Sequence, residues 1–320
     1  MHVALVHNVT AGDREFEPDD LVGLLHEAGH EVTEFGKTKQ DVARAIASYP
    51  DVLAVAGGDG TIAKAAVALR GSKLPLVVLP TGTANNIARS LGLAGPVPAI
   101  IHDLSSAGSL RLDIGHVSAP WGEKTFVEAA GLGFIAAMLR GGRSVRARLE
   151  RFIKTVGRPT EHRIHGAAGG VARLIGRHVA RYYEVRADGE DLSGEYLAVE
   201  AMNIREIGPR VPLAPHADPG DGLLDLVLVE PDARAALVDY VASRGASVER
   251  LPAISRRVRR VIVSWPANDG HVDDKPWPRA RHAAGADGSR QVQIGVQGAI
   301  DVLVPRAVTG EAPTTSSATR

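Results

Sequence analysis

Short apolar runs rich in β-branched residues alternate with amphipathic stretches through the first third of the chain. Apolar runs bounded by turn residues predict buried strands, and apolar residues at helical spacing predict helices. The strands are expected at residues 3–8, 31–35, 52–56 and 75–80, and the helices at residues 21–28, 41–48, 62–69 and 87–91. Because strands and helices alternate, we expect a doubly wound α/β domain with a parallel sheet covered by helices on both faces.

Beyond residue 98 the pattern changes to successive strands separated by turn residues. These strands are expected at residues 110–117, 125–130, 179–187, 196–202, 223–229, 258–265, 290–296 and 300–304, with helices near residues 135–156 and 233–241. Runs of strands after an alternating region predict a second domain, built mainly of antiparallel sheet with helices.

The change of pattern divides the chain into two domains and a tail. We expect the α/β domain at residues 1–125 and the β-rich domain at residues 126–306, with the boundary near residues 115–132. Residues 307–320 are rich in Thr, Ser, Ala and Pro, so this tail is expected to be disordered.

The composition excludes several classes of protein. The chain has 320 residues, 44% of them hydrophobic, and a mean hydropathy of −0.02, which is ordinary for a soluble globular protein. It contains no Cys, so disulfides and thiolate chemistry are excluded. Its N-terminus resembles a first strand rather than a signal peptide, and no apolar run is long enough to span a bilayer, so the cytoplasm is expected. Only 4% of the residues are aromatic, which argues against nucleic-acid binding.

Charge is unevenly distributed although the formal net charge is zero. Residues 1–100 carry a net charge of −3, whereas residues 140–186 carry 12 basic against 3 acidic residues, a net charge of +9. Within this region, residues 140–158 interleave Arg and Lys with apolar residues at near-helical spacing. Such a stretch can lie on an anionic membrane, and the basic pairs at 256–257 and 259–260 would extend the surface. An ordinary amphipathic helix packed on the second domain's sheet is the alternative.

Two glycine-rich turns carry the strongest functional signal. Residues 57–61 read Gly-Gly-Asp-Gly-Thr and residues 82–86 read Gly-Thr-Ala-Asn-Asn, and each turn follows a predicted strand and opens a predicted helix. Free backbone N–H groups at a helix N-terminus favour phosphate oxygens, and glycine lets the backbone approach a ligand closely. The pair of turns predicts a nucleotide held at the carboxyl ends of adjacent strands. The alternative for each turn is a tight turn with an Asp that caps the helix.

Five blocks, in chain order, resemble the catalytic family of diacylglycerol kinase-type lipid kinases. They are residues 8–12, 57–61, 79–89, 112–115 and 218–225. The resemblance implies a phosphofructokinase-like first domain, a β-sandwich-like second domain, a fold shared with NAD kinases, and ATP and Mg²⁺ as cofactors. The residues that it places near the nucleotide are Asn8, Thr10, Gly12, Thr38, Gly57, Gly58, Asp59, Gly60, Thr61, Thr83, Asn85 and Asp113.

The same resemblance implies a structural Mg²⁺ in the second domain. Asp218, Asp221 and Leu223 match the positions that bind this ion in bacterial members of the family. Mg²⁺ prefers oxygen ligands such as carboxylates and main-chain carbonyls. From the sequence alone, a Pro-Gly-Asp-Gly turn that leads into a strand is nearly as good an interpretation.

The chain departs from the family pattern at two acidic positions. Lys275 stands where the family has the Glu thought to act as general base, and Asn86 stands where it has an Asp. A protonated Lys could pair with phosphate but would be a poor base. We therefore expect Asp273, which matches the remaining carboxylate of that motif, to accept the proton, with Asp59 as a second catalytic residue and Asp274 as a further candidate.

These observations predict an ATP- and Mg²⁺-dependent lipid kinase that phosphorylates a lipid hydroxyl, with a diacylglycerol-like substrate. The expected partner is a lipid at the inner face of the membrane, where the protein would bind peripherally; a homodimer is compatible with exposed edge strands. NAD kinase is the rival enzyme, because it shares the first glycine turn. A catalytically impaired nucleotide-binding regulatory protein is the rival from another class, and Lys275 and Asn86 support it.

Overall fold

The computed structural model describes residues 1–12, 16–93, 95–140, 160–246, 250–264, 270–278 and 290–305. The helices are α1 Pro18–Glu27, α2 Lys39–Ala47, α3 Asp59–Ala68, α4 Asn86–Ser90, α5 Val97–His102, α6 Phe134–Arg140, α8 Thr160–Ile175 and α9 Arg234–Ser243, with short 3-10 turns η1 Leu104–Ser106 and η2 Pro231–Ala233. The strands are β1 His2–His7, β2 Glu31–Phe35, β3 Val52–Gly57, β4 Leu76–Pro80, β5 Gly108–Ala119, β6 Gly122–Phe126, β7 Ala129–Gly133, β8 Arg181–Ala187, β9 Glu190–Asp191, β10 Gly194–Tyr196, β11 Ala198–Met202, β12 Leu224–Val229, β13 Ile254–Val258, β14 Arg260–Ser264, β15 Gly270–Val272, β16 Lys275–Pro276 and β17 Gln291–Val304.

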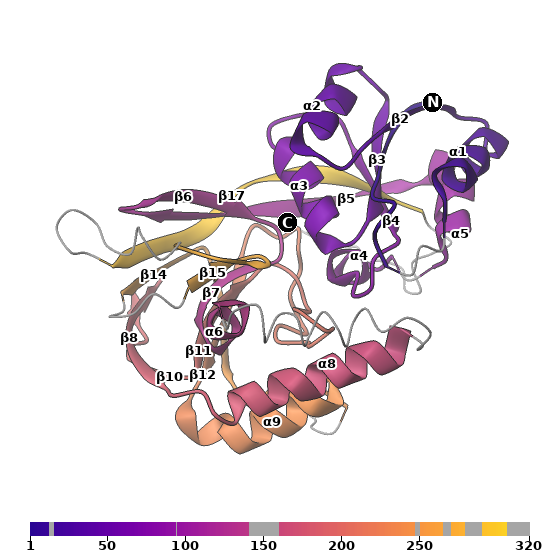
Figure 1. Ribbon diagram of the computed structural model, residues 1–320. Coiled ribbons are helices and arrows are strands. Elements are labelled where there is room, and N and C mark those ends of the chain that lie inside the picture. Colours follow the sequence, from indigo (N-terminus) through magenta and orange to yellow (C-terminus); the bar gives the residue numbers. More distant parts are fainter. Residues whose placement is uncertain are drawn as a thin grey trace, which may run out of the picture.

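The N-terminal part is a parallel sheet between two layers of helices (Figure 1). Its strands lie in the order β4-β3-β1-β2, and each neighbouring pair is parallel. Every residue of β3 is buried, because helices cover both faces of the sheet. The doubly wound architecture predicted from the sequence is therefore confirmed.

One long strand, β17, joins the C-terminal end of the chain to this sheet. Val302 and Leu303 pair in parallel with β4, and the strand runs antiparallel to β5 from Gln293 to Val304. Figure 1 shows β17 in yellow beside β5, reaching from the α/β part to β14. The sequence predicted two strands, at 290–296 and 300–304. They are one strand with an irregularity between Val296 and Gly298, where the register shifts and pairing continues.

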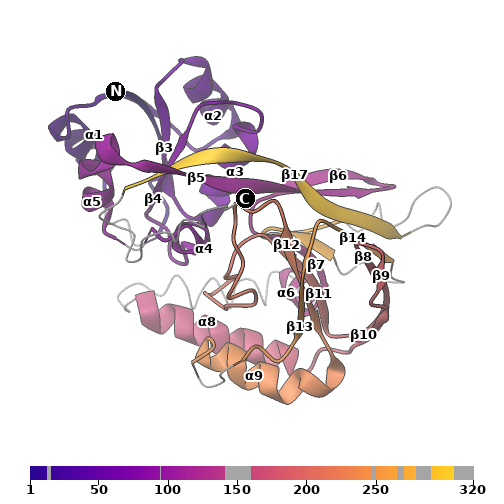
Figure 2. The same ribbon diagram turned by 180° about the vertical axis from the view of Figure 1, so that it is seen from behind.

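The rest of the chain forms a β-sandwich flanked by helices (Figure 2). A second sheet, in the order β13-β12-β11-β7-β15-β16, is antiparallel throughout. One face packs its buried side chains, such as Leu132 and Leu226, against those of β8 and β14, such as Val185 and Val261. The other face packs against α6, α8 and α9. The predicted β-rich antiparallel domain is thus confirmed in its architecture.

Two predicted strands are each interrupted where a carboxylate accepts hydrogen bonds from backbone N–H groups. The strand predicted at 125–130 ends at β6 and restarts at β7, because Asp273 accepts the intervening N–H groups. The strand predicted at 258–265 begins earlier, as β13, and breaks between β13 and β14, where Asp188 accepts the N–H groups of Arg259 and Arg260. Neither tertiary contact is visible in a local pattern.

Helix α8 was not predicted. It contains three glycines, at positions 166, 169 and 170, which lower its intrinsic helix propensity. Its buried residues Val171, Ala172 and Ile175 join the core with α9, so tertiary packing overrides the local signal.

Two predictions fall outside the described residues. These are the basic amphipathic stretch beyond residue 140 and the tail at residues 307–320. Among the helices of the ranges given above, none combines the length and apolarity required to cross a membrane.

Candidate functional site

Three loops at the carboxyl ends of β1, β3 and β4 meet with almost no space between them. A Cβ atom on Gly82 would lie 2.4 Å from the Cα atom of Gly58, and one on Gly12 would lie 2.2 Å from the carbonyl oxygen of Thr81. Gly12 also has a φ of +53°, which L side chains rarely adopt. Glycine is required at these positions because backbone packs directly on backbone, a reason that the sequence analysis did not anticipate.

Asn8 ties the first loop to the first glycine turn. Its Nδ2 donates to Thr61 Oγ1 at 3.0 Å, and its Oδ1 accepts from the Thr10 hydroxyl at 2.9 Å. Lys37 Nζ donates to the same Oδ1 at 2.7 Å, so it supplies a positive charge to this loop. The sequence drew attention to Asn8, Thr10 and Thr61 but gave no sign of Lys37, which lies beyond β2.

A cleft of about 580 Å³ opens between these loops and the β-rich part of the chain. Its lining includes eight of the residues predicted to bind nucleotide or to act in catalysis. They are Asn8, Gly12, Gly58, Asp59, Gly60, Thr61, Thr83 and Asp273. Residues that are distant in sequence, such as Glu128, Met138 and Ile207, complete the opposite wall.

Asp59 opens α3, and its carboxylate faces the start of α4. Oδ1 accepts the N–H of Ile87 at 2.9 Å, and the N–H groups of Asn85 and Asn86 also point to this carboxylate. Burial raises the pKa of Asp59 above its ordinary value, although these hydrogen bonds oppose the shift. The carboxylate thus links the two glycine turns while it lines the cleft.

Asp273 reaches the cleft from the turn after β15 and has a left-handed φ of +47°. Its Oδ1 accepts the N–H groups of Val127 at 3.1 Å and Glu128 at 2.9 Å, and its own N–H donates to Ala129 at 2.8 Å. Burial raises its pKa to about 6. Asp273 therefore both contributes a carboxylate to the cleft and fixes the turn between β6 and β7.

Glu128 is a candidate residue that the sequence analysis missed. It lies in the turn held by Asp273, is only 7% exposed, and lines the cleft. Burial raises its pKa well above the ordinary value, and the charges of Asp59 and Asp273 raise it further. One signal was available: Glu128 is the only charged residue between 126 and 139, and an isolated charge in an apolar run calls for a reason.

A buried pair behind the cleft supports this arrangement. His271 Nε2 and Glu200 Oε2 are 2.8 Å apart, and neither side chain has any exposed surface. His271 Nδ1 lies 2.9 Å from the carbonyl oxygen of Asp273, so a protonated imidazole donates on both sides. Burial alone would lower the pKa of His271, but the charge of Glu200 and the hydrogen bonds outweigh it and raise the pKa. The pair holds the Asp273 turn in place.

Two lysines and one carboxamide complete the polar lining. Lys64, one turn into α3, and Lys275 both line the cleft. The side chain of Lys275 is 68% exposed, and its Nζ lies 3.5 Å from Asp274 Oδ1. Asn86 is 2% exposed, donates to the carbonyl oxygen of Gly208 at 3.0 Å, and has a buried Oδ1 without a hydrogen-bond partner in the described structure.

Five residues predicted to bind nucleotide lie away from the cleft lining. Thr38 caps α2, where its hydroxyl accepts the N–H of Asp41. Asn85 has a left-handed φ of +55° and donates to the carbonyl oxygens of Pro80 and Gly82, so it shapes the second turn from within. Thr10 and Gly57 also lie outside the cleft lining.

Asp113 is the fifth, and it lies on β5 in contact with the 219–222 turn of the β-rich part. Its Oδ2 accepts the N–H of Gly222 at 2.6 Å, and its own N–H donates to Pro219. It is 2% exposed, and burial raises its pKa. In this position Asp113 anchors one part of the chain to the other rather than lining the cleft.

The three residues predicted to hold a structural Mg²⁺ form a turn in which each predicted carboxylate already has partners. Asp218 Oδ1 accepts the N–H of Gly220 at 3.1 Å, and Asp221 Oδ1 accepts the N–H of Leu223 at 2.8 Å. Asp221 is also ion-paired with Arg257. The Arg257 guanidinium already neutralises the Asp221 carboxylate and would have to be displaced or shared if a cation bound there; Mg²⁺ at this turn stays a prediction.

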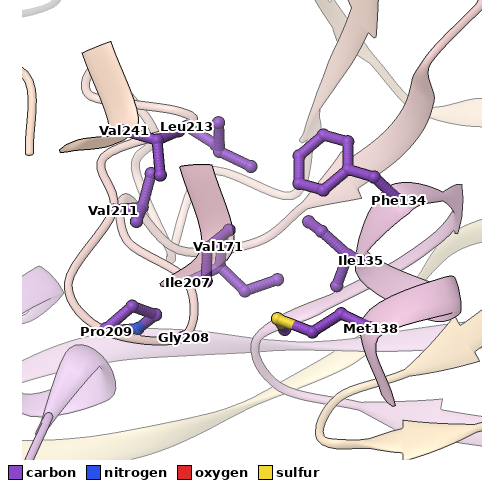
Figure 3. A pocket seen from close by; sticks show the side chains of 10 residues that line it. All are labelled: Phe134, Ile135, Met138, Val171, Ile207, Gly208, Pro209, Val211, Leu213 and Val241. Carbon is purple, nitrogen blue, oxygen red and sulfur yellow. The ribbon is translucent and has the colours of Figure 1, made fainter. Parts of the chain in front are cut away.

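An apolar cavity lies beside the cleft (Figure 3). It holds about 20 Å³ and is lined by residues of α6, α8, α9 and the 207–213 segment. Phe134, Ile135 and Met138 face Ile207 across it in Figure 3. Ile135, Met138, Ile207 and Gly208 line both spaces, so polar cleft and apolar cavity share one wall.

Comparison with known proteins finds similar sequences over most of the chain. The profile of the "Diacylglycerol kinase catalytic domain" family matches residues 2–117, and that of the "YegS C-terminal NAD kinase beta sandwich-like domain" matches residues 145–309. A curated protein of Pseudomonas aeruginosa named "Probable lipid kinase YegS-like" is 31% identical over 288 residues, which cover 85% of this chain and 86% of that protein. "Diacylglycerol kinase" of Mycobacterium tuberculosis is 28% identical over 236 residues, 72% of each chain.

A solved structure shares the fold. The crystal structure of a diacylglycerol kinase from Bacillus anthracis str. Sterne superposes with a TM-score of 0.67, over 96% of this chain and 98% of that one. Its sequence identity to this chain is 19%, so this likeness bears on the fold alone.

Proposed function

The chain belongs to the diacylglycerol kinase family of lipid kinases, and on that premise we propose that it transfers the γ-phosphate of ATP to the hydroxyl group of a diacylglycerol-like lipid. The observation that carries the proposal is a single cleft that has the glycine turns and Asp59 on one side and borders the apolar cavity on the other.

The glycine turns supply the groups that phosphoryl transfer requires. Catalysis of this reaction consists mostly of positioning and of stabilising developing negative charge. Backbone at Gly58, Gly60 and Gly82 can approach phosphate oxygens closely, the hydroxyls of Thr61 and Thr83 can donate to them, and Lys64 can neutralise charge. This arrangement supports ATP as the phosphate donor.

The carboxylates of the cleft fit a divalent cation that arrives with the nucleotide. Asp59 and Glu128 have raised pKa values because burial leaves their negative charges poorly compensated. Within the described ranges, no three acidic or histidine side chains are grouped as a ready-made metal site. Mg²⁺ commonly binds through one or two carboxylates together with substrate phosphates, and when bound it would neutralise charge on the transferred group.

The proton of the acceptor hydroxyl must pass to a group in the cleft. In the proposed reaction the lipid oxygen forms a bond to the γ-phosphorus, the bond to the β-phosphate oxygen breaks, and ADP leaves. Asp273 is the predicted proton acceptor, and Glu128 is the second candidate because its buried carboxyl group lines the same cleft and has a raised pKa. A carboxylate with a pKa near the working pH suits this role.

The acceptor side of the cleft favours an apolar substrate. Ile135, Met138 and Ile207 lead from the cleft into a cavity walled by apolar side chains (Figure 3). Its volume of about 20 Å³ admits little more than a water molecule, so an acyl chain would have to enter by moving α6 or the 207–213 segment. We propose that the lipid is presented at the inner face of a membrane, where the net positive charge of residues 140–186 favours binding to the anionic surface.

A direct transfer assay tests the proposal. Labelled γ-phosphate from ATP is offered, with Mg²⁺, to diacylglycerol and to other lipid alcohols in mixed micelles, and separately to NAD. Asp59→Asn is the matched control, because an amide oxygen can still accept the N–H of Ile87. Labelled lipid formed only by the unsubstituted protein supports the proposal. Labelled NADP would favour NAD kinase, and nucleotide binding without transfer to any acceptor would favour a non-catalytic protein.

A further inference from the structure

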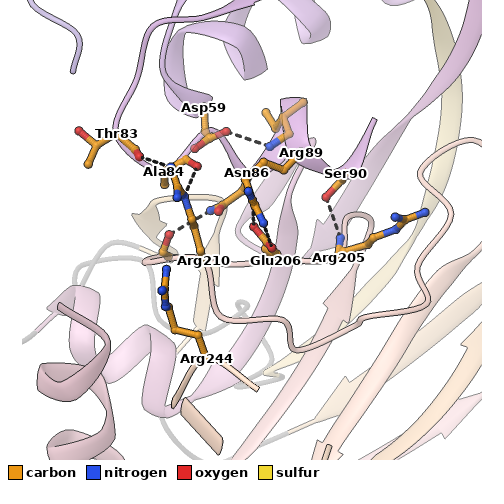
Figure 4. Close-up of polar contacts among 12 residues, drawn as sticks. Asp59, Thr83, Ala84, Asn86, Arg89, Ser90, Arg205, Glu206, Arg210 and Arg244 are labelled. Atoms are coloured by element: carbon orange, nitrogen blue, oxygen red, sulfur yellow. Dashed lines mark hydrogen bonds and ion pairs between the residues drawn. The ribbon is translucent and has the colours of Figure 1, made fainter. Parts of the chain in front are cut away.

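The segment 205–210 of the β-rich part forms hydrogen bonds and an ion pair with the second glycine turn and with α4, the helix after it (Figure 4). Arg89 and Glu206 form a bidentate ion pair, with N–O distances of 2.7 and 3.0 Å. Asn86 donates to Gly208, and the N–H of Arg205 donates to Ser90 Oγ at 3.1 Å. Two parts of the chain more than a hundred residues apart are thus connected at the phosphate side of the cleft.

Arg210 makes the contact that reaches the turn itself. Its Nε donates to the carbonyl oxygen of Ala84 at 2.9 Å, and its Nη2 donates to that of Thr83 at 3.1 Å. Its Nη1 is ion-paired with Glu161, which Arg244 also binds, at 3.0 Å. The guanidinium is therefore held on three sides, and the Arg210 side chain is only 16% exposed.

The backbone conformation at Arg210 directs its side chain toward the glycine turn. Arg210 has a left-handed φ of +56°, which is uncommon for a residue with a Cβ atom and costs free energy. Ile207 and Val211 pair on either side through N–H to carbonyl bonds of 2.9 and 3.0 Å, and close the segment into a tight loop. A strained conformation held by a closed loop makes the position of the side chain well defined.

The two carbonyl contacts fix how the turn presents its other groups. In a trans peptide the N–H points opposite to the preceding carbonyl. When Arg210 holds the carbonyl groups of Thr83 and Ala84, the N–H groups of Ala84 and Asn85 point to the opposite side, where Asn85 N–H meets Asp59. The Thr83 side chain lines the cleft from the same turn.

We propose that Arg210 is a positioning residue for the phosphate-binding turn: it holds residues 83–85 in the conformation that receives the nucleotide phosphates. This inference rests on the proposed function, because the phosphates are those of the bound ATP. Arg210 itself acts through the turn and lies outside the cleft lining in the described structure.

Three variants of the full chain test this role. Arg210→Met removes both carbonyl contacts, Arg210→Lys keeps the charge but not the two-pronged geometry, and Arg244→Met breaks the neighbouring pair with Glu161 without touching the turn. For each, we would measure the Kd of ATP with Mg²⁺ by calorimetry, the KM for ATP, the KM for lipid, kcat and the melting temperature.

The expected result is selective for the nucleotide. Arg210→Met should raise the Kd and KM for ATP about tenfold or more, since hydrogen bonds from a charged donor are lost. Arg210→Lys should raise these two constants less. In Arg244→Met, the Kd and KM for ATP should stay within about twofold of the unsubstituted values, and the KM for lipid should do so in all three variants. If Arg210→Met does not fold, Arg210→Lys carries the comparison with Arg244→Met.

Two outcomes overturn the inference in distinguishable ways. An unchanged Kd for ATP in folded Arg210 variants, or an equal loss in Arg244→Met, would reject the role of Arg210 and leave the proposed function intact. An unsubstituted protein that binds no ATP would reject both. Altered ATP binding by the Arg210 variants in a protein that phosphorylates no lipid would support the positioning role while rejecting the proposed lipid acceptor.

Discussion

Three carboxylates from three distant parts of the chain, Asp59, Glu128 and Asp273, share one cleft, and burial raises the pKa of each. Asp59 and Asp273 also accept backbone N–H groups, so both help to hold the fold. A site of this kind stores electrostatic repulsion that a cation or a proton relieves. Charge-neutral substitutions at these residues therefore separate their structural contribution from their chemical one.

Replacing Glu128 by Gln should stabilise the protein and impair catalysis. The neutral amide removes a buried like charge, so we expect the free energy of unfolding at pH 8 to rise by about 1–2 kcal/mol. If Glu128 accepts the proton or binds the cation, kcat should fall roughly 100-fold. Urea unfolding and the lipid phosphorylation assay measure the two effects.

Glu123→Gln is the matched control for this change, because Glu123 is a 68%-exposed carboxylate on the neighbouring strand β6. It should leave both quantities nearly unchanged. Full activity in Glu128→Gln would show that the Glu128 carboxylate has no part in catalysis, and Asp273 would then be the one remaining candidate of the two for accepting the proton.

Replacing Asp273 by Asn should change how stability depends on pH. The folded-state pKa of about 6 lies above the ordinary 3.8, so between these values the unfolded chain releases the proton first. The unsubstituted protein consequently loses stability as the pH rises through this window, and the variant does not. Between about pH 4 and about pH 7, the free energy of unfolding of the unsubstituted protein should therefore fall by about 2 kcal/mol more than that of Asp273→Asn.

Urea unfolding across this pH range measures the Asp273 effect. A difference between the two proteins that stays constant with pH would mean that the Asp273 pKa is ordinary in the folded state. The Asn oxygen can still accept the two N–H groups, so the comparison is not confounded by loss of the turn.

Sequence reasoning singles out individual residues where their role is local. The glycine turns could be identified because glycine, Asp and small hydroxyls follow apolar strands in sequence. Glu128, Lys37 and Arg210 were missed because each reaches the site through a tertiary contact. The predicted general base, Asp273, lines the cleft as expected, but its role stays a prediction.

The β7 strand shows how an element is adapted to a polar group buried beneath it. A Cβ atom on Gly131 would lie 1.9 Å from Glu200 Oε2, so the strand needs glycine where it crosses the Glu200 and His271 pair. Local patterns describe the strand but not this requirement. Glu200 and His271 are 71 positions apart in the sequence, so no local pattern predicts the pair.

Replacing Gly131 by Ala should be strongly destabilising. The new methyl group has to displace a fully buried ion pair or the strand, so we expect the free energy of unfolding to fall by about 3 kcal/mol. Gly169→Ala in α8 is the matched control: its Cβ would have no neighbour within 4 Å, and it should gain about 0.5–1 kcal/mol from helix propensity. Thermal and urea unfolding of the two variants measure the difference, and equal stabilities would show that the pair moves aside without penalty.

On the scale of the whole molecule, the chain is organised around one sheet that both predicted domains share. The alternation of strands and helices was enough to predict the N-terminal architecture, and successive strands were enough to predict the β-rich one. The sequence could not show that β17 returns to the first sheet, because pairing between residues some two hundred positions apart has no local signature. Its residues Ile300, Val302 and Val304 belong to the N-terminal core.

This return strand predicts that residues 1–125 do not fold cooperatively on their own. Without β17, strand β5 loses the partner that flanks its whole length, and β4 becomes an open edge with apolar side chains exposed. The same fragment extended by residues 290–305 through a short Gly/Ser linker regains that partner and the three core residues. Thermal unfolding followed by circular dichroism should therefore give a cooperative transition for the extended fragment and a broad, gradual change for the shorter one. A sharp transition for residues 1–125 alone, at a similar temperature, would mean that β17 is dispensable to the first core and that the α/β part is an independent folding unit.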